Sequence, residues 1–379
     1  MGSPEPPTRP ARRRRRSLFA AAAVGLLAIT AAACRVPSRY DAAVVIDGLK
    51  SPWDLSFVPD GSSFFFTERT GDLNWGTTDG QRLVIGHPAD VVAQGEGGLM
   101  GIAVDRGFDS NRRIYACYMT ANDVRVVRFQ VDGRLQVDAG TPIVTGIQRS
   151  TSGRHSGCRV RIGPDGYIYV TTGDAARATN PQDLNVLNGK VLRVNTSGDP
   201  VRADGNPYGS NMANGTSVIF AYGFRNPQGI SWRPSDGQPF LVEHGADRDD
   251  EITPIVAGGN GGWNPGPGYN ESVPMTNFAL GDNVMAPQWT SGFPTIAPSG
   301  GTFVTSELWG DRAGQMAMAV LKGQQLRMIN LNPGVVEAGG AAISNLGRIR
   351  VAVESPFDGR LYVLTDSPSG QIIQITPVI

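Results

Sequence analysis

The chain has 379 residues, with 49 glycines, 27 prolines, 18% charged residues, 8% aromatic residues and a formal net charge of +0. Long helices and coiled coils need many Glu, Lys and Ala residues, so this composition argues against them. Three cysteines are too few for a disulfide framework, and an apolar content of 40% argues against a disordered chain. The composition therefore favours a folded protein of strands and turns.

The positive charge is concentrated at the N-terminus. Residues 1–33 hold six arginines and one glutamate, so the rest of the chain has 28 basic and 33 acidic residues, a net charge of about −5. Nucleic-acid binding needs a clustered cationic surface, which a mildly acidic body does not provide. We therefore expect no nucleic-acid partner.

Residues 1–33 have the pattern of an export signal. Five consecutive arginines precede an apolar, alanine-rich run that is shorter than the roughly 20 residues of a spanning helix. The run RRSLF at 15–19 fits a twin-arginine signal, and the run AAAC at 31–34 fits a lipoprotein cleavage site. A plain secretory signal and a short membrane anchor are the alternatives.

This signal predicts both the location and the division of the chain. We expect an exported protein of the cell envelope, attached to the outer face of the membrane only through a lipid anchor at Cys34. Residues 34–40 would form a short linker, and residues 41–379 would form the folded domain.

From residue 51 onward the chain repeats one short theme six times. Each copy has an alternating apolar strand, a turn rich in Pro, Asp and Gly, and a second apolar strand that often ends in Thr and an acid. Pro and Asp start a tight turn and Gly supplies positive φ, so each copy is predicted to be a hairpin. The copies span residues 53–69, 99–119, 158–174, 228–245, 298–322 and 350–366.

The spacing of the hairpins predicts an all-β, six-bladed β-propeller. Successive copies begin about 40 to 70 positions apart, which leaves room for two further strands, such as residues 123–131 and 189–194. Four strands per repeat make one propeller blade. A pair of stacked sandwiches is the competing architecture, but it does not require one hairpin to recur. We expect the early strand at 42–49 to pair with the last blade and close the ring.

In a propeller, the loops at one end of the blades converge on the central axis, so polar residues at equivalent ends of the repeats are candidates for a site. His155 stands immediately before the third hairpin and is flanked by glycines. An imidazole is the simplest general base near neutral pH, although a single His is more often structural. Its position at the end of a blade favours catalysis.

The fourth hairpin is flanked by two further candidate segments. Arg225 and Asn226 precede it and supply a fixed cation and an amide, which would stabilise a developing negative charge or cap strand carbonyls. Residues 244–251 follow it as an acidic loop, whose oxygens would suit Ca²⁺ or remain solvated.

Basic residues also mark the last two hairpins. Arg348 and Arg350 are two positions apart on a strand and point to one face, Lys322 follows an apolar strand, and Asp366 is placed to orient one of the arginines. A solvated strand face is the alternative. Together with a base and an oxygen-rich loop, these cations would suit an anionic cofactor with several carboxylates, bridged to a metal.

These motifs resemble the soluble PQQ-dependent aldose (glucose/sorbosone) dehydrogenase family, six-bladed propellers that oxidise sugars to lactones. The resemblance covers residues 49–377. It is carried by GEGGLMGIAVD (95–105), HSGCRVRIGPDG (155–166), GKVLRVN (189–195), YGFRNPQGI (222–230), EHGADRDDEI (243–252), GFPTIAPSG (292–300), and GRIR (347–350) with LYVLTD (361–366).

The resemblance implies a role for each candidate residue. His155 would take the proton of the anomeric hydroxyl while hydride passes from C1 of the aldose to PQQ. Arg225 and Asn226 would contact the reacting quinone. The implied PQQ-binding set is Glu96, Lys322, Arg348, Arg350 and Asp366, and the implied Ca²⁺ set is Gly245 and Ala246 with Glu251. No motif indicates the electron acceptor.

Among the departures from the family pattern, Glu96 and Ala175 stand where Gln is frequent, and Arg154 stands where an acid is frequent. A carboxylate at position 96 would repel a tricarboxylate cofactor unless it is protonated or paired, with Arg154 as one partner. Two alternative functions therefore stay open: a non-catalytic surface propeller that binds sugar or protein, and a metal-dependent lactonase on the same ring.

Cys117 and Cys158 lie in the second and third hairpins. If adjacent blades bring them into range, an exported location permits a disulfide. Two buried thiols in neighbouring sheets are the alternative.

Overall fold

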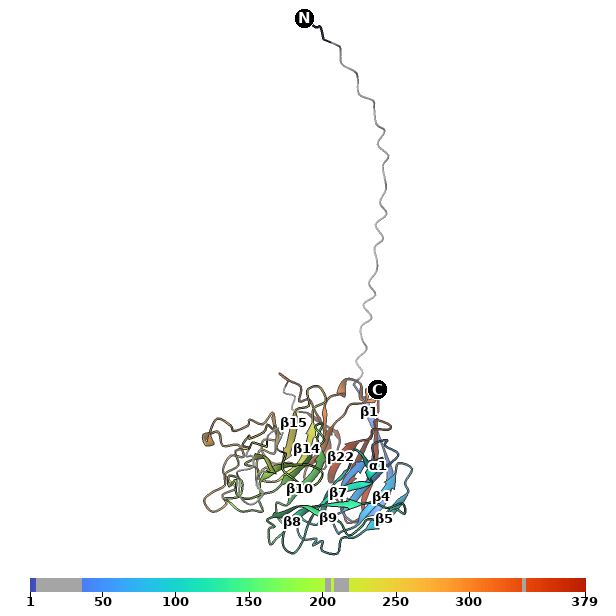
Figure 1. Ribbon diagram of the computed structural model, residues 1–379, viewed down its shortest axis with the longest axis vertical. Helices are drawn as coiled ribbons and strands as arrows, with labels where there is room; N and C mark the ends of the chain where they lie inside the picture. Colours follow the sequence, from blue (N-terminus) through green and yellow to red (C-terminus); the bar gives the residue numbers. More distant parts are fainter. Residues whose placement is uncertain (5–35, 202–205, 208–217, 336–338) are drawn as a thin grey trace. The chain divides into compact units, whose positions relative to one another are not determined.

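The six expected hairpins are the inner halves of six four-stranded antiparallel sheets (Figure 1). The computed structural model describes residues 1–4, 36–201, 206–207, 218–335 and 339–379. The arginine run, the apolar run and Cys34 lie outside the described residues. The described chain is a six-bladed β-propeller, and the predicted fold is confirmed.

Blades 1 to 5 are each built from four consecutive strands, paired in chain order. Blade 1 is β2 (Pro52–Phe57), β3 (Ser63–Glu68), β4 (Leu73–Thr77) and β5 (Arg82–Gly86). Blade 2 is β6 (Leu99–Val104), β7 (Arg113–Met119), β8 (Val124–Gln130) and β9 (Thr141–Ile147). Blade 3 is β10 (Gly157–Ile162), β11 (Ile168–Thr172), β12 (Lys190–Val194) and β13 (Ile219–Tyr222). Blade 4 is β14 (Pro227–Trp232), β15 (Pro239–Glu243), β16 (Glu251–Pro254) and β17 (Trp289–Thr290). Blade 5 is β18 (Pro298–Phe303), β19 (Met316–Val320), β20 (Gln325–Ile329) and β21 (Gly340–Ile343).

Blade 6 joins the two ends of the folded chain. It consists of β22 (Ile349–Glu354), β23 (Leu361–Thr365), β24 (Gly370–Val378) and β1 (Arg39–Leu49). β1 pairs antiparallel with β24, from Arg39 opposite Val378 to Leu49 opposite Gly370. The expected closing strand is therefore confirmed. It begins three residues earlier than predicted, because its backbone keeps pairing as far as Val378.

The first strand of each blade lies next to the first strand of the following blade. β2 contacts β6, β6 contacts β10, β10 contacts β14, β14 contacts β18, and β18 contacts β22. β22 in turn contacts β2, which completes the ring. We call the end of the ring where these strands begin the N-side mouth, and the end where they finish the C-side mouth. Because each hairpin is antiparallel, its second strand ends at the N-side mouth.

The core lies between neighbouring blades. Between blades 6 and 1, the rings of Phe57, Phe64 and Tyr362 pack edge to face, with centroids 5.1–5.4 Å apart for the two pairs that include Phe57. Burying an aromatic side chain of this size contributes about 2–3 kcal/mol. The blades are therefore held rigidly, which fixes the residues at their ends.

Polar side chains fill the axis between the two mouths. Asp54 accepts from both terminal nitrogens of Arg161 at 2.8 Å, and it lies 2.6 Å from Nη1 of Arg159. The Arg159 guanidinium lies over the ring of Trp53, 4.1 Å from its centroid. These groups are largely or fully buried, so the channel is packed rather than open.

Cys117 of β7 and Cys158 of β10 form a disulfide, with their Cα atoms 6.0 Å apart. The bond joins blades 2 and 3 and closes a loop with a sequence separation of 41 residues. Closing a loop of this length stabilises a fold by roughly 3–4 kcal/mol. The predicted disulfide is confirmed.

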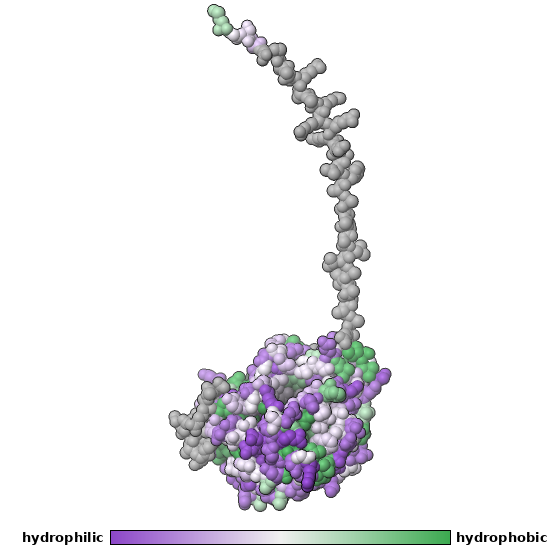
Figure 2. Space-filling model, turned by 45° about the vertical axis from the view of Figure 1, so that its right-hand side comes forward, coloured by the Kyte–Doolittle hydropathy of each residue, from purple (hydrophilic) through white to green (hydrophobic). Residues whose placement is uncertain are grey.

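Helices contribute little to the described chain. They are α1 (Phe108–Asn111), η2 (Phe278–Leu280) and η3 (Glu307–Arg312). In the described residues there is no helix with the length and apolar character needed to cross a membrane. Figure 2 shows a surface on which polar residues predominate and apolar residues are interspersed.

Candidate active site

The third hairpin brings His155 and Asp174 together at the N-side mouth. His155 precedes β10 and Asp174 follows β11, and Nδ1 of the imidazole lies 2.8 Å from Oδ1 of the carboxylate. A carboxylate can only accept, so Nδ1 carries a proton, and Nε2 is the nitrogen that holds the lone pair when the ring is neutral. His155 is buried and has a φ of 54°, a left-handed conformation that is uncommon outside glycine. The fold therefore holds the imidazole in a fixed orientation.

The long connection between β16 and β17, residues 255–288, completes the surroundings of Asp174. Trp263 Nε1 and the Tyr269 hydroxyl donate to Oδ2 at 2.9 and 2.7 Å, and the amide of Ala176 donates to Oδ1 at 2.7 Å. The Tyr269 oxygen is also 2.9 Å from Nδ1 of His155. Desolvation and the charge of Asp174 raise the pKa of Tyr269, which keeps its hydroxyl a donor.

Sequence reasoning did not select Asp174, Trp263 or Tyr269. The signal for Asp174 was present, because the repeated hairpins often end in Thr and an acid. Trp263 and Tyr269 lie in a connection with no strand pattern, so no local signal indicated them.

Arg225 and Asn226 lie between blades 3 and 4, immediately before β14. Both backbone N–H groups donate to Oε1 of Glu243, the Asn226 bond being 3.2 Å long. The Arg225 guanidinium donates to the His244 carbonyl at 3.3 Å and to Glu271 at 2.5 Å. This arginine is therefore a buried cation whose backbone and side chain are both fixed.

Glu271 links Arg225 to a second arginine, since the same oxygen accepts from Arg154 at 2.5 Å. Desolvation opposes ionisation, but hydrogen bonds from the two arginines lower the pKa of Glu271 to about 2. The carboxylate therefore stays charged and bridges the two cations.

Glu96, from the loop before β6, reaches the same place. Its Oε2 accepts from the Asn226 amide at 3.0 Å and from the His155 backbone N–H at 3.3 Å. The Asn226 side-chain oxygen in turn accepts from Gly157 N at 3.2 Å. Arg154 was considered as the hydrogen-bonding partner of Glu96, but it binds Glu271 instead, because the 255–288 connection brings that acid to it.

The last hairpin places Arg348, Arg350 and Asp366 together. Oδ2 of Asp366 accepts from both arginines at 2.9 Å, so it orients two rather than one. Arg350 is buried and also donates to Gln228 at 2.7 Å, whereas the side chain of Arg348 is 46% exposed. Lys322 lies apart from them in the β19–β20 turn, where it is exposed and donates to the Thr295 hydroxyl at 3.4 Å.

His244 lies where residues of blades 3, 4 and 6 come together at the N-side mouth. Desolvation, then the charges of Arg350, Arg225 and His155, lower the pKa of His244 to about 3. Its Nε2, and Nε of both arginines, are buried without a hydrogen-bond partner among the described residues. Buried N–H donors left without acceptors are costly, and an anionic, acceptor-rich ligand would satisfy the Nε–H groups of the two arginines. This mouth therefore fits a cofactor such as PQQ.

The predicted calcium ligands are only partly brought together. In the described residues, no hydrogen-bond donor is recorded on the carbonyl oxygens of Gly245 and Ala246, which leaves them available as hard ligands. Glu251 does not join them through any recorded contact, since both of its oxygens accept from Thr276 at 2.8 and 3.0 Å. Desolvation raises the pKa of Glu251 to about 8. No cluster of three or more His, Cys, Asp or Glu that could hold a metal occurs in the part of the chain that the structure describes.

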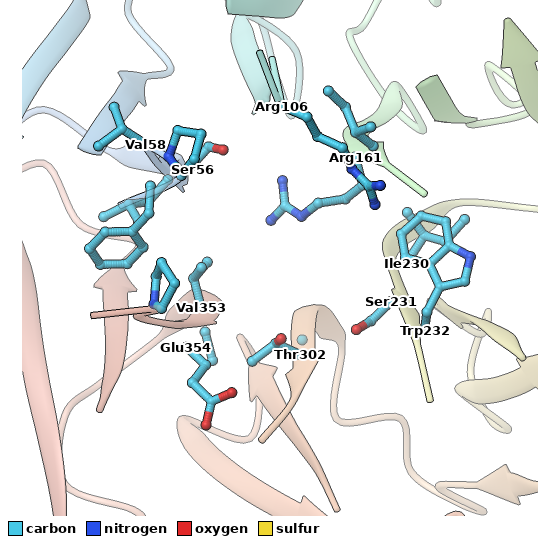
Figure 3. Close-up of a pocket in the computed structure, with 17 residues that line it drawn as sticks. Ser56, Val58, Arg106, Arg161, Ile230, Ser231, Trp232, Thr302, Val353 and Glu354 are labelled. Carbon is cyan, nitrogen blue, oxygen red and sulfur yellow. The ribbon is translucent and has the colours of Figure 1, made fainter. Parts of the chain in front are cut away.

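A cavity of about 490 Å³ opens at the C-side mouth, among the final residues of five inner strands (Figure 3). Arg106 and Arg161 lie on one side and Glu354 on another. Arg161 is occupied by Asp54, and Glu354 accepts bonds from the Thr305 hydroxyl and from the amides of residues 305 and 306. None of the candidate residues lines this cavity. The chemistry is therefore expected at the N-side mouth.

Comparison with known proteins identifies the class. The profile of the Glucose / Sorbosone dehydrogenase family matches residues 49–374. The aldose sugar dehydrogenase YliI of Escherichia coli is 29% identical over 365 residues, which cover 93% of this chain and 97% of that one. The PQQ-bound aldose sugar dehydrogenase of Streptomyces coelicolor superposes with a TM-score of 0.73 at 28% identity, over 90% of this chain and 99% of that one. The apo enzyme of E. coli gives a TM-score of 0.80 at 28% identity, over 89% and 99%.

The chain belongs to the glucose/sorbosone dehydrogenase family. It is an aldose sugar dehydrogenase of this PQQ-dependent family, so the predicted family and enzyme class are confirmed. Gluconolactonases resemble it only in fold: that of Xanthomonas campestris is 14% identical, with a TM-score of 0.51.

Proposed function

We propose that this protein oxidises aldoses at C1 to lactones, with PQQ and Ca²⁺ as cofactors and His155 as the general base. The observation that carries the proposal is the geometry of His155, whose Nδ1–H is held by Asp174 and whose Nε2 is left as the acceptor. The PQQ-bound relative from S. coelicolor supports the choice of cofactor.

The residues divide the reaction among them. Bound PQQ supplies a two-electron acceptor for the hydride that leaves C1. Nε2 of His155 takes the proton of the anomeric hydroxyl, so that C1 and its oxygen form the lactone carbonyl. Asp174 holds the ring and stabilises the imidazolium that results. The Arg225 guanidinium and the Asn226 amide stabilise negative charge that develops beside the base.

The same mouth provides groups for the cofactor carboxylates. Arg348 and Arg350 are assigned to them together with Lys322, and Asp366 orients the two arginines. Glu96 already accepts from Asn226, so its carboxylate is directed to that amide. The carbonyls of Gly245 and Ala246 are assigned to Ca²⁺. Glu251 follows this loop in the chain but is not assigned as a ligand of the ion.

The proposal is tested by reconstitution. PQQ and CaCl₂ are added to the purified protein, and dye reduction is followed with a panel of aldoses. Activity that needs both additions and disappears in His155→Ala supports it. If the protein shows neither a spectral shift nor thermal stabilisation with PQQ, the departures at Glu96 and Ala175 prevent binding, and a sugar- or protein-binding role replaces the proposal.

We also propose export and lipid attachment at Cys34, on the strength of the N-terminal pattern alone. The protein should be recovered in the envelope membrane fraction, with a lipid-modified N-terminal peptide by mass spectrometry. Cys34→Ser should release it from that fraction. Retention of this variant in the membrane would contradict the anchor.

A further inference from the structure

Two opposite blades share a feature that the other four lack. In blade 1, Pro52 of β2 pairs with Glu68 of β3, and in blade 4, Pro227 of β14 pairs with Glu243 of β15. A register shift follows this first pair, as it does in the other four hairpins. The equivalent position in the other blades is uncharged: Tyr118, Thr172, Val320 and Thr365.

Both glutamates reach back to the same place in their own blade. Glu68 accepts from the amide of Lys50 at 2.7 Å, and Glu243 accepts from the amide of Arg225. Each donor lies two residues before the proline that begins the inner strand. Glu68 is 0% exposed and Glu243 is 3% exposed. Each buried carboxyl therefore binds the segment that precedes the first strand of its blade in the same way. We call this glutamate–amide contact the latch.

The backbone around each latch is also equivalent. The amide of Arg69 donates to the Ser51 carbonyl at 3.0 Å, and the amide of His244 donates to the Asn226 carbonyl at 3.3 Å. The residue after each glutamate thus binds the residue before each proline. The position of Glu243 therefore follows from a backbone arrangement that blades 1 and 4 share.

Blade 4 differs in what the latch holds. Glu243 takes a second N–H, that of Asn226, and the carbonyl of Arg225 accepts from the Asp174 amide at 2.8 Å. The segment that carries two site residues is therefore held by Glu243 on one side and by blade 3 on the other. Glu68 instead pairs with Arg82 at 3.0 Å, on the outer part of its own blade.

We propose that Glu243 is a positioning residue of the dehydrogenase reaction, which sets the backbone of Arg225 and Asn226 and so places both side chains in the site. The inference rests on the proposed function. Without this oxygen, two buried N–H groups lose their acceptor, which is unfavourable, and the segment moves to satisfy them. A displacement of 1 Å in such a group lowers activity about 10²-fold.

The test compares Glu243→Thr, Glu243→Gln and Glu68→Thr. Threonine is the residue that blades 3 and 6 carry at this register, so the fold accommodates it, but its side chain is too short to reach the amides. Glutamine keeps the accepting oxygen. Glu68→Thr removes the matched latch where no site residue depends on it.

The first measurement is amide hydrogen exchange in the protein without PQQ. Exchange at Arg225 and Asn226 should be about tenfold or more faster in Glu243→Thr, and it should match the wild type in Glu243→Gln and Glu68→Thr. Exchange at Lys50 should rise only in Glu68→Thr. Wild-type exchange at Arg225 and Asn226 in Glu243→Thr would overturn the proposal.

The second measurement is turnover after loading with PQQ and Ca²⁺. Glu243→Thr should lower kcat about 10²-fold, Glu243→Gln should restore it to within about threefold of the wild type, and Glu68→Thr should lower only the Tm. Equal losses of kcat in the two threonine variants would reduce Glu243 to a structural role and overturn the proposal. An inactive wild type would contradict the proposed function. The exchange rates would then still show whether Glu243 holds the backbone of Arg225 and Asn226.

Discussion

The two mouths of the ring use similar side chains in different ways. At the C-side mouth, Arg161 donates both terminal nitrogens to Asp54, and Glu354 accepts from the neighbouring backbone and a hydroxyl. At the N-side mouth, Arg225 and Arg350 each keep a buried Nε without a partner among the described residues, as does Nε2 of His244.

This difference separates groups that stabilise the fold from groups that await a ligand. Polar groups that are fully paired within the protein add to stability or to its specificity, whereas buried groups with spare hydrogen-bonding capacity lower it. Buried nitrogens with no hydrogen-bond partner in the described chain also occur on Trp53 and Arg159 of the axis. It is therefore the grouping of Arg225, Arg350 and His244 at one place that points to a site at the N-side mouth. The cavity at the C-side mouth is large, but its charges are already satisfied.

The largest effect is expected when the imidazole that we propose as the base is removed. His155→Gln should lower kcat/KM about 10³-fold, because general-base catalysis contributes roughly 10²–10⁴-fold. The Tm should change little, since glutamine can still bond to Asp174. Steady-state dye reduction measures the first quantity and calorimetry the second. Arg106→Met at the C-side mouth is the control and should leave kcat/KM unchanged; equal losses in both variants would contradict the assignment of chemistry to the N-side mouth.

The converse test acts on the packed axis near the C-side mouth. Asp54→Asn leaves Arg159 and Arg161 without their carboxylate, so the free energy of unfolding should fall by about 3–5 kcal/mol. Urea denaturation measures this loss. The kcat of the folded, loaded fraction should stay near the wild-type value. A stable variant with impaired kcat would show that the two mouths are not separable in this way.

A smaller effect is expected from the arginines that we propose to bind the cofactor. Arg348→Met should weaken PQQ binding about tenfold, because a hydrogen bond to a charged group contributes about 1.5–3 kcal/mol and this side chain is partly exposed. Titration with PQQ, followed by its absorbance, gives the Kd. An unchanged Kd in Arg348→Met would remove Arg348 from the binding set.

The smallest effect is the pH dependence of the Glu271 bridge. The pKa of Glu271 is lowered to about 2, so its stabilisation is complete above the ordinary value near 4.5 and is lost as the pH falls toward 2. Glu271→Gln should therefore be less stable than the wild type at pH 6, by about 1 kcal/mol for a pair open to solvent, and equally stable near pH 2. Urea midpoints at both pH values measure the gap. A gap that is the same at both would exclude the bridge as its origin.

The repeated hairpins made most of the fold predictable. Their turn chemistry recurs at the same place in each copy, and six copies leave few architectures. His155 could be found because it stands at the entry of one hairpin. The two late arginines were expected on one face of a strand. In the structure β22 begins at Ile349, so Arg348 lies just before the strand, although both arginines donate to Asp366.

The partners of these residues were harder to predict. Tyr269 and Glu271 come from a connection whose course is set by tertiary contacts, and Arg154 meets Glu271 across a separation of 117 residues. The Glu251 side chain was expected at the calcium loop, yet its place on β16 directs it to Thr276. Which of several nearby acids a cation binds is decided by packing, which a local pattern does not contain.

The pairing of β1 with β24 has a consequence for biosynthesis. Blade 6 combines residues 39–49 with residues 349–378, so a nascent polypeptide that still lacks residues 370–378 has five complete blades, an unpaired edge on β23 and an unpaired β1. Closure can occur only after the last strand has left the ribosome. The ring therefore closes only in the full-length chain. A prematurely terminated product would expose these unpaired strands to proteolysis and aggregation.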